Sequence, residues 1–288
     1  MRRILTVDIG NSNIVIGIWQ NECLLATKRF PSGRDLREEE LERQLFEKLS
    51  DSDMGYDFNT QKFDGAILSS VLPEITDKFL NILNKITKDK PLLMEAYLNT
   101  GIKLGNYTGS GIGTDRIVDL AAAYSKQKSS VMVCDIGTYT TITVADSEGT
   151  ILGGMICSGI QLSLDAGGER ASQLPKMRAD FCDRLLGTDT ESNMLCGAVV
   201  STGVMISGLF EKVRTGKLNP VEEDGGTAKS YLLEEDAKTE SAADVDLSTL
   251  KLVITGGLAR FALPWISCEY TYEPDLLLYG LKEIYEMN

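Results

Sequence analysis

An internal repeat constrains most strongly what this chain can fold into. A run of β-branched residues ends at Asp8-Ile-Gly10 and a second such run follows, and the same pattern returns around Asp135-Ile-Gly137. Residues 5–18 and 132–145 align without a gap, and a polar turn comes next at residues 20–22 and 147–149. β-Branched runs separated by glycine and polar residues predict strands. Each copy therefore predicts a hairpin followed by a third strand.

The remaining segments alternate between strand-like and helix-like patterns. Asp35 followed by Glu38 resembles a capping box ahead of leucines at helical spacing. Strands are predicted at residues 63–71, 91–96 and 252–255, and helices from Pro73, from about Asp115, over residues 160–172, from about Glu191 and from Pro274. This order favours layered α/β lobes, at residues 1–128 and 129–288, and two such lobes normally leave a cleft between them.

The composition suits a soluble, two-domain protein. The chain has 288 residues, of which 43% are hydrophobic and 25% charged. No run approaches the roughly 20 apolar residues of a membrane span, and Asp8 interrupts the apolar start too early for a secretion signal. The six cysteines lie far apart without Cys-x-x-Cys spacing, so they indicate neither a zinc site nor a disulfide framework. We therefore expect a cytoplasmic protein with no membrane partner.

The titratable residues limit the chemistry and the partners that this chain can have. The absence of histidine removes Ser-His-Asp and Cys-His catalysis, so proton transfer falls to a carboxylate, Lys, Tyr or Cys. A formal net charge of −13 argues against a nucleic-acid partner. Residues 221–246 carry nine acids against two lysines, which predicts a solvated insertion without a catalytic role.

The paired Asp-x-Gly hairpins suit phosphate binding. Glycine lets the backbone approach a phosphate closely, and Asn11, Ser12 and Thr138 can donate hydrogen bonds to its oxygens. The aspartates repel phosphate, so their natural task is to hold a cation or its bound water. One such turn is commonplace, but two at corresponding points of a repeat favour a nucleotide site. No P-loop sequence occurs, and the glycines at residues 109–113 form an incomplete dinucleotide fingerprint.

With these motifs the chain resembles the type III pantothenate kinases, members of the acetate and sugar kinase, heat-shock 70 and actin superfamily. The resemblance covers almost the whole chain. It is carried, in the family's order, by Asp8-x-Gly-Asn-Ser12, Gly113-Thr-Asp115-Arg116, Asp135-x-Gly-Thr138, Leu152-Gly-Gly154, Leu174-Pro175, Thr190 and Thr255-Gly-Gly257.

The resemblance implies a fold, an activity and cofactors. The fold would be two duplicated RNase H-like, actin-like lobes with an interlobe cleft, in a homodimer. The enzyme would use ATP to convert pantothenate to 4′-phosphopantothenate, the first step of coenzyme A biosynthesis. Magnesium would accompany ATP, and Asp135 would bind a monovalent cation, potassium or ammonium.

The same resemblance implies the site residues. The ATP phosphates would be bound by Asp8, Ile9, Gly10, Asn11, Ser12, Asn13, Ile14 and Val15, together with Thr138. Pantothenate would be contacted by Tyr107, Gly113, Thr114, Asp115, Arg116 and Thr190. Asp115 would be the proton acceptor, which is chemically adequate because phosphoryl transfer depends mainly on positioning and charge stabilisation. Structural roles stay open, with Asp115 or Thr190 capping a helix and Arg116 forming an ion pair.

Some positions depart from the family pattern. Tyr139 and Thr114 each stand where alanine is usual, Ser158 stands where proline is common, and Tyr107 lacks the Asn-Pro that should follow it. These changes leave both hairpin aspartates and Asp115 intact, so they affect substrate selectivity more than phosphoryl transfer. Two alternatives stay open: a kinase of another small alcohol on the same fold, and a non-catalytic paralogue that binds nucleotide or pantothenate.

Overall fold

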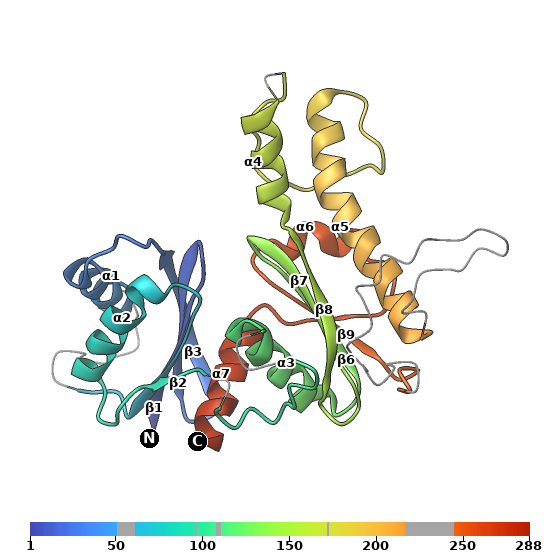
Figure 1. Ribbon diagram of the computed structural model, residues 1–288. Helices are drawn as coiled ribbons and strands as arrows, with labels where there is room; N and C mark the ends of the chain where they lie inside the picture. The colour runs from blue at the N-terminus through green and yellow to red at the C-terminus, as the bar shows by residue number, and fades with distance from the viewer. Residues whose placement is uncertain (51–60, 96, 108–110, 172, 217–244) are drawn as a thin grey trace, which may run out of the picture. The chain divides into compact units, whose positions relative to one another are not determined.

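The computed structural model describes residues 1–50, 61–95, 97–107, 111–171, 173–216 and 245–288 (Figure 1). The chain forms two compact units, each built on a five-stranded sheet. Unit 1 comprises Met1–Ile102, Tyr107–Lys126 and Glu273–Asn288, and unit 2 comprises Lys103–Asn106 and Gln127–Tyr272. The predicted boundary at residues 128 and 129 therefore did not anticipate that the C-terminal segment packs with the N-terminal half.

The sheet of unit 1 has the strand order β3-β2-β1-β4-β5. An antiparallel meander is formed by β1 (Arg3–Ile9), β2 (Asn13–Gln20) and β3 (Cys23–Pro31). Parallel strands β4 (Gly65–Ser70) and β5 (Leu92–Leu93) extend the sheet beyond β1. Because β1 is a central strand, its residues 4–7 are buried on both faces, and the half-buried Asp8 follows near its end.

Helices cover both faces of this sheet (Figure 1). One face packs against α1 (Glu38–Ser50) and α2 (Pro73–Ile86), which contribute leucines, isoleucines and a phenylalanine to a continuous core. On the other face lie α3 (Thr114–Gln127) and α7 (Leu276–Met287). The predicted capping box is wrong, because α1 begins at Glu38 and Asp35 stands outside the N-cap position.

Two glycines let α7 approach the rest of unit 1 closely. A Cβ on Gly65 of β4 would collide with the hydroxyl of Tyr285, and a Cβ on Gly280 would collide with the carbonyl oxygen of Val118 in α3. Trp19 also packs edge-on against Tyr279 at a ring-centroid distance of 5.0 Å. The C-terminal helix is therefore an integral part of unit 1.

The sheet of unit 2 repeats the arrangement of unit 1, in the order β10-β9-β6-β7-β8. The meander consists of β6 (Val131–Ile136), β7 (Tyr139–Ala145) and β8 (Ile151–Ser158). Parallel strands β9 (Lys251–Thr255) and β10 (Thr271–Tyr272) follow beside β6, as β4 and β5 do beside β1. The two units thus share one strand order, which confirms the predicted α/β duplication.

The helices of unit 2 lie partly on its sheet and partly beyond it. Two of them, α4 (Ile160–Arg170) and α5 (Thr190–Arg214), run side by side (Figure 1). A short helix, α6 (Ala259–Ala262), and a 3₁₀ turn, η2 (Leu263–Trp265), follow β9 and pack against α5.

Of the described helices, α5 is long and apolar enough to cross a membrane by length and composition. Half of its apolar 18-residue window is buried inside the protein. There Val199, Ile206 and Phe210 join the hydrophobic core of unit 2. The core helix of a soluble protein passes the same test of length and composition, and the burial of α5 fits that interpretation. The predicted acidic insertion lies, except for residues 245 and 246, outside the described residues.

Candidate active site

The first hairpin places Asp8 near the end of β1, where the turn to β2 begins. In the strand register Asp8 lies opposite Ser69 of the parallel strand β4. The backbone N–H of Gly10 donates to the carbonyl oxygen of Asn13 over 2.9 Å. Residues 11 and 12 are exposed at the tip of the turn. Their backbone N–H groups and polar side chains are therefore positioned for a ligand such as phosphate.

Ser32, which follows β3 directly, braces this turn. Its hydroxyl donates to the carbonyl oxygen of Gly10 at 2.8 Å, and its backbone N–H donates to the carbonyl oxygen of Ser12 at 3.1 Å. Both bonds use carbonyl groups of the turn as acceptors. The sequence carried no signal for this role of Ser32.

The second hairpin places Asp135 at the corresponding point of β6. Asp135 lies opposite Thr255 of the parallel strand β9. The N–H of Gly137 donates to the carbonyl oxygen of Tyr139 over 3.0 Å, so a single residue, Thr138, forms the tip. This turn is one residue shorter than the first. Tyr139 is consequently the counterpart of Asn13, and the ungapped alignment of the repeat is wrong beyond the glycine.

Two further glycines pack closely around the second hairpin. Gly159 donates its N–H to the carbonyl oxygen of Thr138 at 3.1 Å, and a Cβ there would collide with the carbonyl oxygens of Gly137 and Thr138. Gly256 has a φ of +101°, and a Cβ there would collide with the carboxylate of Asp135. Gly256 thus packs against the Asp135 carboxylate, and Gly159 packs against two carbonyl oxygens of the turn. Carboxylate and carbonyl oxygens are the ligands that hard cations prefer.

The described residues contain no cluster of three or more Cys, Asp or Glu side chains that could hold a metal ion. A magnesium ion fits this donor set only if it is bound mainly by the phosphates of a nucleotide and by water, with one carboxylate such as that of Asp8 beside it.

Asp115 lies in unit 1, close to the first hairpin. The hydroxyl of Thr114, the first residue of α3, lies 3.4 Å from the hydroxyl of Ser69. Ser69 is the β4 residue opposite Asp8, so α3 begins beside the carboxyl ends of β1 and β4. The half-buried Asp115 carboxylate accepts the backbone N–H of Arg116 at 2.9 Å. The structure thus brings the predicted base and the predicted phosphate turn onto neighbouring elements.

Gly113 provides the space for the Asp115 carboxylate, because a Cβ on Gly113 would collide with Oδ1 of Asp115. Asp115 is the second residue of α3 and therefore not its N-cap, although a negative charge in the first turn is favoured by the helix dipole. Arg116, predicted to contact pantothenate, is only 8% exposed. Most of its side chain therefore lies inside the protein.

The other predicted acceptor residues belong to different parts of the chain. Tyr107 is half-buried in unit 1, next to residues 108–110, which lie outside the described residues. Thr190 is exposed at the start of α5 in unit 2. It does not cap that helix, because Asp189 is the N-cap and its carboxylate accepts the N–H of Ser192 at 2.9 Å. The predicted cap at Thr190 is therefore wrong by one residue.

Sequence reasoning also missed Ser69 and the packing role of Gly256. Ser69 had a signal, since two serines end an otherwise apolar strand pattern at residues 65–70. Gly256 stood in a Thr-Gly-Gly motif, but its closeness to Asp135 depends on the pairing of β6 with β9.

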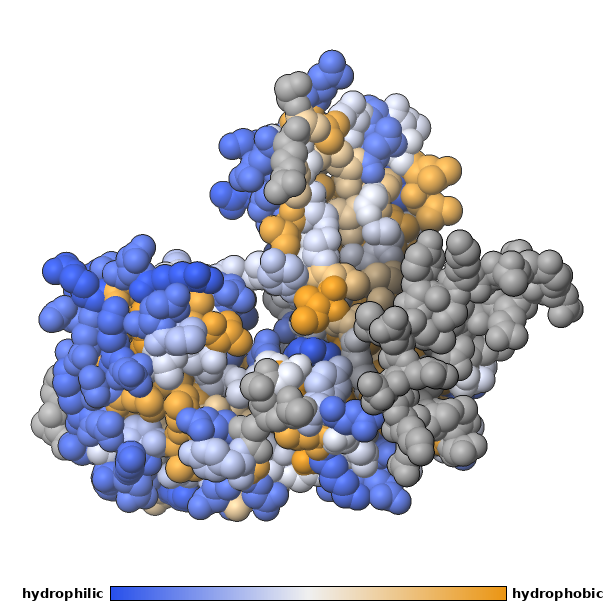
Figure 2. Space-filling model, in the orientation of Figure 1, coloured by the Kyte–Doolittle hydropathy of each residue, from blue (hydrophilic) through white to orange (hydrophobic). Residues whose placement is uncertain are grey.

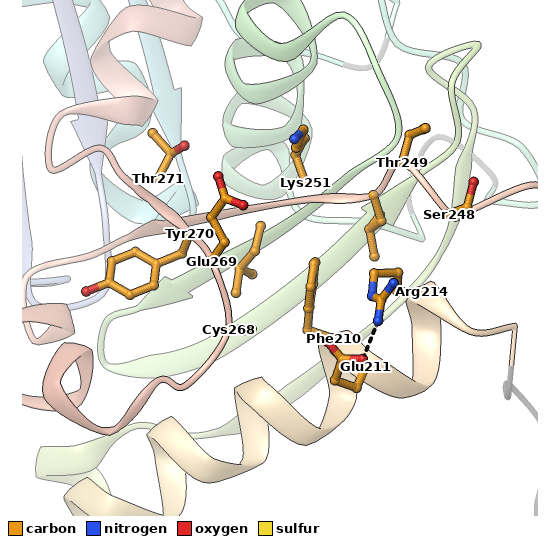
Figure 3. A pocket seen from close by; sticks show the side chains of 12 residues that line it. Phe210, Glu211, Arg214, Ser248, Thr249, Lys251, Cys268, Glu269, Tyr270 and Thr271 are labelled. Carbon is orange, nitrogen blue, oxygen red and sulfur yellow. Dashed lines mark hydrogen bonds and ion pairs between the residues drawn. The ribbon is translucent and has the colours of Figure 1, made fainter.

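A cavity of about 590 Å³ lies elsewhere in unit 2 (Figure 3). Its walls come from the last turns of α5 and from residues 248–252 and 268–271. Arg214 on its wall is paired with Glu211 at 2.7 Å, as Figure 3 shows. Neither Asp135 nor Thr138 lines this cavity, so it is separate from the candidate active site.

Comparison with known sequences identifies relatives. A family model described as type III pantothenate kinase matches residues 4–212. The chain is similar to a type III pantothenate kinase of Agathobacter rectalis, with 31% identity over 282 residues, which covers 98% of this chain and 96% of the relative. The range matched by the family model includes both hairpins, the start of α3 and the start of α5.

Solved structures of low identity are similar in fold. MreB 5 of Spiroplasma citri, bound to AMPPNP, matches with a TM-score of 0.52 and 10% identity over 99% of this chain and 96% of that chain. The ethanolamine utilization protein EutJ of Carboxydothermus hydrogenoformans matches with a TM-score of 0.52 and 13% identity over 100% and 90% of the two chains. At these identities the likeness concerns the fold alone, and it confirms the predicted actin-like architecture.

Proposed function

This chain belongs to the type III pantothenate kinase family, and on that premise we propose that Asp115 accepts the proton of the pantothenate hydroxyl. The enzyme uses ATP to phosphorylate pantothenate to 4′-phosphopantothenate, in coenzyme A biosynthesis. The observation that carries the assignment is the position of Asp115, in the first turn of a helix that begins beside the strand end bearing Asp8.

Asp115 suits the chemistry of this step. Phosphoryl transfer passes through a loose transition state, so the acceptor hydroxyl loses its proton late. The carboxylate has to orient that hydroxyl towards the γ-phosphate and then take the proton. Gly113 leaves room for the carboxylate in its present position, which supports a role that depends on that position.

The first hairpin is proposed to bind the ATP phosphates through residues 8–15. Asn11 and Ser12 are exposed at the tip, where N–H groups and polar side chains can donate to phosphate oxygens. Asp8 would hold a water of the divalent ion that accompanies ATP, and Thr138 of the second hairpin would complete the nucleotide site. The divalent ion supplies charge neutralisation on the phosphates when it is bound.

The second hairpin is proposed to hold the monovalent cation, potassium or ammonium. Supporting this role, Gly256 packs against the Asp135 carboxylate, and the same turn carries the carbonyl oxygens of Gly137 and Thr138 against Gly159. Oxygen ligands of this kind suit a hard cation of low charge. The cation would supply positive charge near the nucleotide when it is bound.

Pantothenate is proposed to be received by Tyr107, Gly113, Thr114, Arg116 and Thr190, together with Asp115. In support, the hydroxyl of Thr114 lies 3.4 Å from that of Ser69, the residue opposite Asp8. Thr190 is exposed at the start of α5. Because little of Arg116 is exposed, it would act mainly by anchoring α3. Its positive charge would also lie near an anionic group, such as the pantothenate carboxylate or ATP.

We also propose a cytoplasmic homodimer with no membrane or nucleic-acid partner. Apolar side chains gather on the surface of unit 2 around α4 and α5 (Figure 2). Exposed large apolar side chains of this unit are Ile156, Phe181, Leu186 and Val204, which are between 53% and 78% exposed. A surface of this kind favours association with another protein surface. Sedimentation velocity on the wild-type chain and on Ile156→Asp would test the dimer, and a monomeric wild-type chain would contradict it.

The deciding experiment compares Asp115→Asn with the wild type in an assay of pantothenate-dependent ADP release. We expect kcat to fall by about 10²–10⁴-fold, with ATP binding retained, because asparagine can still accept the N–H of Arg116. Glu74→Gln is the matched control, since it removes an acidic group from the first turn of α2 in the same unit. Turnover retained in Asp115→Asn would disprove the proposed base.

A second variant tests the position of the carboxylate. In Gly113→Ala the new Cβ must displace the end of the Asp115 side chain. This movement should change the free energy of unfolding little, but it takes the carboxylate away from its catalytic position. We expect a lower kcat with an unchanged melting temperature. A panel of small alcohols in the same assay separates pantothenate from another acceptor, and nucleotide binding by calorimetry without ADP release would indicate the non-catalytic alternative.

A further inference from the structure

Two thiols meet where the segment ahead of α5 returns to that helix. The Sγ atoms of Cys182 and Cys196 lie 3.1 Å apart. Both sulfurs also contact the carbonyl oxygen of Arg184, at 3.1 Å from Cys182 and 3.3 Å from Cys196. The two side chains thus converge on one point, although 14 positions separate them in the sequence.

The two thiols differ in access. Cys182 is half-buried and reachable from solvent, whereas Cys196, in the second turn of α5, is 6% exposed. Burial raises the pKa of the Cys196 thiol, its contact with Cys182 raises that pKa further, and the Arg184 guanidinium acts in the opposite direction. An external oxidant therefore reaches Cys182 first, and Cys196 is placed to react with what forms there.

We propose that Cys182 and Cys196 form a reversible disulfide by exchange with a low-molecular-weight disulfide. The Cys182 thiolate attacks the external disulfide, which gives a mixed disulfide and releases one thiolate. Cys196 gives up its proton to water and attacks the Cys182 sulfur, which releases the second thiolate. Two protein thiols are oxidised and one external disulfide is reduced to two thiols.

The geometry needs little adjustment for this reaction. A disulfide bond is about 2.05 Å long, so the sulfurs must approach by about 1 Å. Rotation of the Cys182 side chain, which belongs to a segment without regular secondary structure, can supply that movement without displacing α5. In a reducing compartment the pair stays reduced, and the bond forms only under oxidative conditions.

The bond would close a ring over residues 182–196. That ring contains the capping box of Asp189 and Ser192 and, next to it, Thr190. The bond would tether the segment that leads into Thr190 to α5 and restrict its movement when a substrate binds. We expect the disulfide to raise KM for pantothenate several-fold and to leave KM for ATP unchanged. This consequence rests on the proposed function, whereas the disulfide itself does not.

Peptide mapping tests the disulfide directly. The full chain is treated with glutathione disulfide, remaining thiols are alkylated, and tryptic peptides are identified by mass spectrometry. We expect a cross-link between the peptides that contain Cys182 and Cys196, reversed by dithiothreitol. Cys182→Ser and Cys196→Ser should each abolish it, and Cys23→Ser, which changes an exposed cysteine of unit 1, should not.

Two results would overturn the proposal. One is glutathione that stays on Cys182 without a link to Cys196. The other is a pair that stays reduced under conditions in which Cys23 is modified; either result would show that the two cysteines serve only as small apolar side chains. If the cross-link forms but KM for pantothenate does not move, the effect on substrate binding is disproved while the modification site stands. Mapping needs no activity, so its outcome is independent of the proposed function.

Discussion

The hairpins of the two units begin with the same three residues and diverge after the glycine. In unit 1 the turn has two exposed residues at its tip and is braced from one side by the hydroxyl of Ser32. In unit 2 the tip is a single residue, and Gly159 and Gly256 press against the turn and against Asp135. The first hairpin therefore presents two exposed residues, whereas in the second a glycine packs directly against the Asp135 carboxylate.

The two copies of a duplicated motif can therefore serve different functions. An open turn rich in N–H groups suits an anion, whereas an enclosed carboxylate suits a cation. The packing around the two hairpins differs although their sequences begin alike, and this difference separates the two proposed roles. Substitutions at the hairpins can test it.

The largest effect is expected from Gly256→Ala. The φ of +101° is unfavourable for alanine, and its Cβ would collide with backbone atoms of Ile136 as well as with Asp135. We expect a loss of about 3–5 kcal/mol in the free energy of unfolding, measured by urea denaturation. Gly137→Ala is the control, because its Cβ would meet nothing closer than 3.5 Å and should cost less than about 1 kcal/mol. If both variants lost the same free energy of unfolding, the close packing of Gly256 against Asp135 and Ile136 would be disproved.

The next effect should separate the two aspartates. Asp8→Asn should lower kcat by about 10–100-fold, equally in potassium and in sodium, because the side chain acts on the nucleotide's own metal ion. Asp135→Asn should instead reduce activity in potassium to the level seen in sodium. The assay is ADP release with each salt at equal ionic strength. If both variants lose potassium activation alike, the division of roles is wrong.

A smaller effect is expected from Ser32→Ala. It removes the hydroxyl that donates to Gly10, a half-buried hydrogen bond worth about 1 kcal/mol. The loosened turn should raise KM for ATP with little change in kcat. Ser32→Thr retains a hydroxyl and should restore both stability and KM. An Ala variant with unchanged KM would show that the brace does not position the turn for ATP.

The smallest effect is expected from Tyr139→Asn, which gives the second turn the residue found at the corresponding place in the first. Tyr139 is 48% exposed, so the free energy of unfolding should change by less than about 0.5 kcal/mol. If the ring narrows the nucleotide site, KM for ATP should fall in the variant. An unchanged KM would show that this departure from the family pattern is neutral.

Local sequence patterns predicted much of this fold, and long-range contacts explain the rest. Strands β1 and β6 and helix α3 follow from apolar periodicity, which depends only on neighbouring residues. The deleted turn residue ahead of Tyr139 became visible only through the pairing of β6 with β7. The cap of α5 moved to Asp189 because Ser192 completes the box with it and not with Thr190.

The candidate site shows the same division. Asp8, Asp115 and Asp135 stand in motifs that can be found by inspection, whereas Ser69 acquires meaning only from its place opposite Asp8 and beside Thr114. Gly256 likewise belongs to the Thr255-Gly-Gly257 motif, but its contact with Asp135 follows only from the pairing of β9 with β6. Sequence motifs therefore identify the charged groups of the site. The small residues that surround these groups are identified only once the pairing of the strands is known.

The place of α7 in unit 1 has a consequence for how the chain is made. A ribosome delivers residues in order, so the strands of unit 1 emerge before the whole of Gln127–Tyr272, while their last helix emerges after it. Until then, the sheet face that receives Tyr285 and Leu278 remains uncovered. The N-terminal strands must therefore wait with part of an apolar face exposed, and such exposed surface makes a partly synthesised chain prone to aggregation.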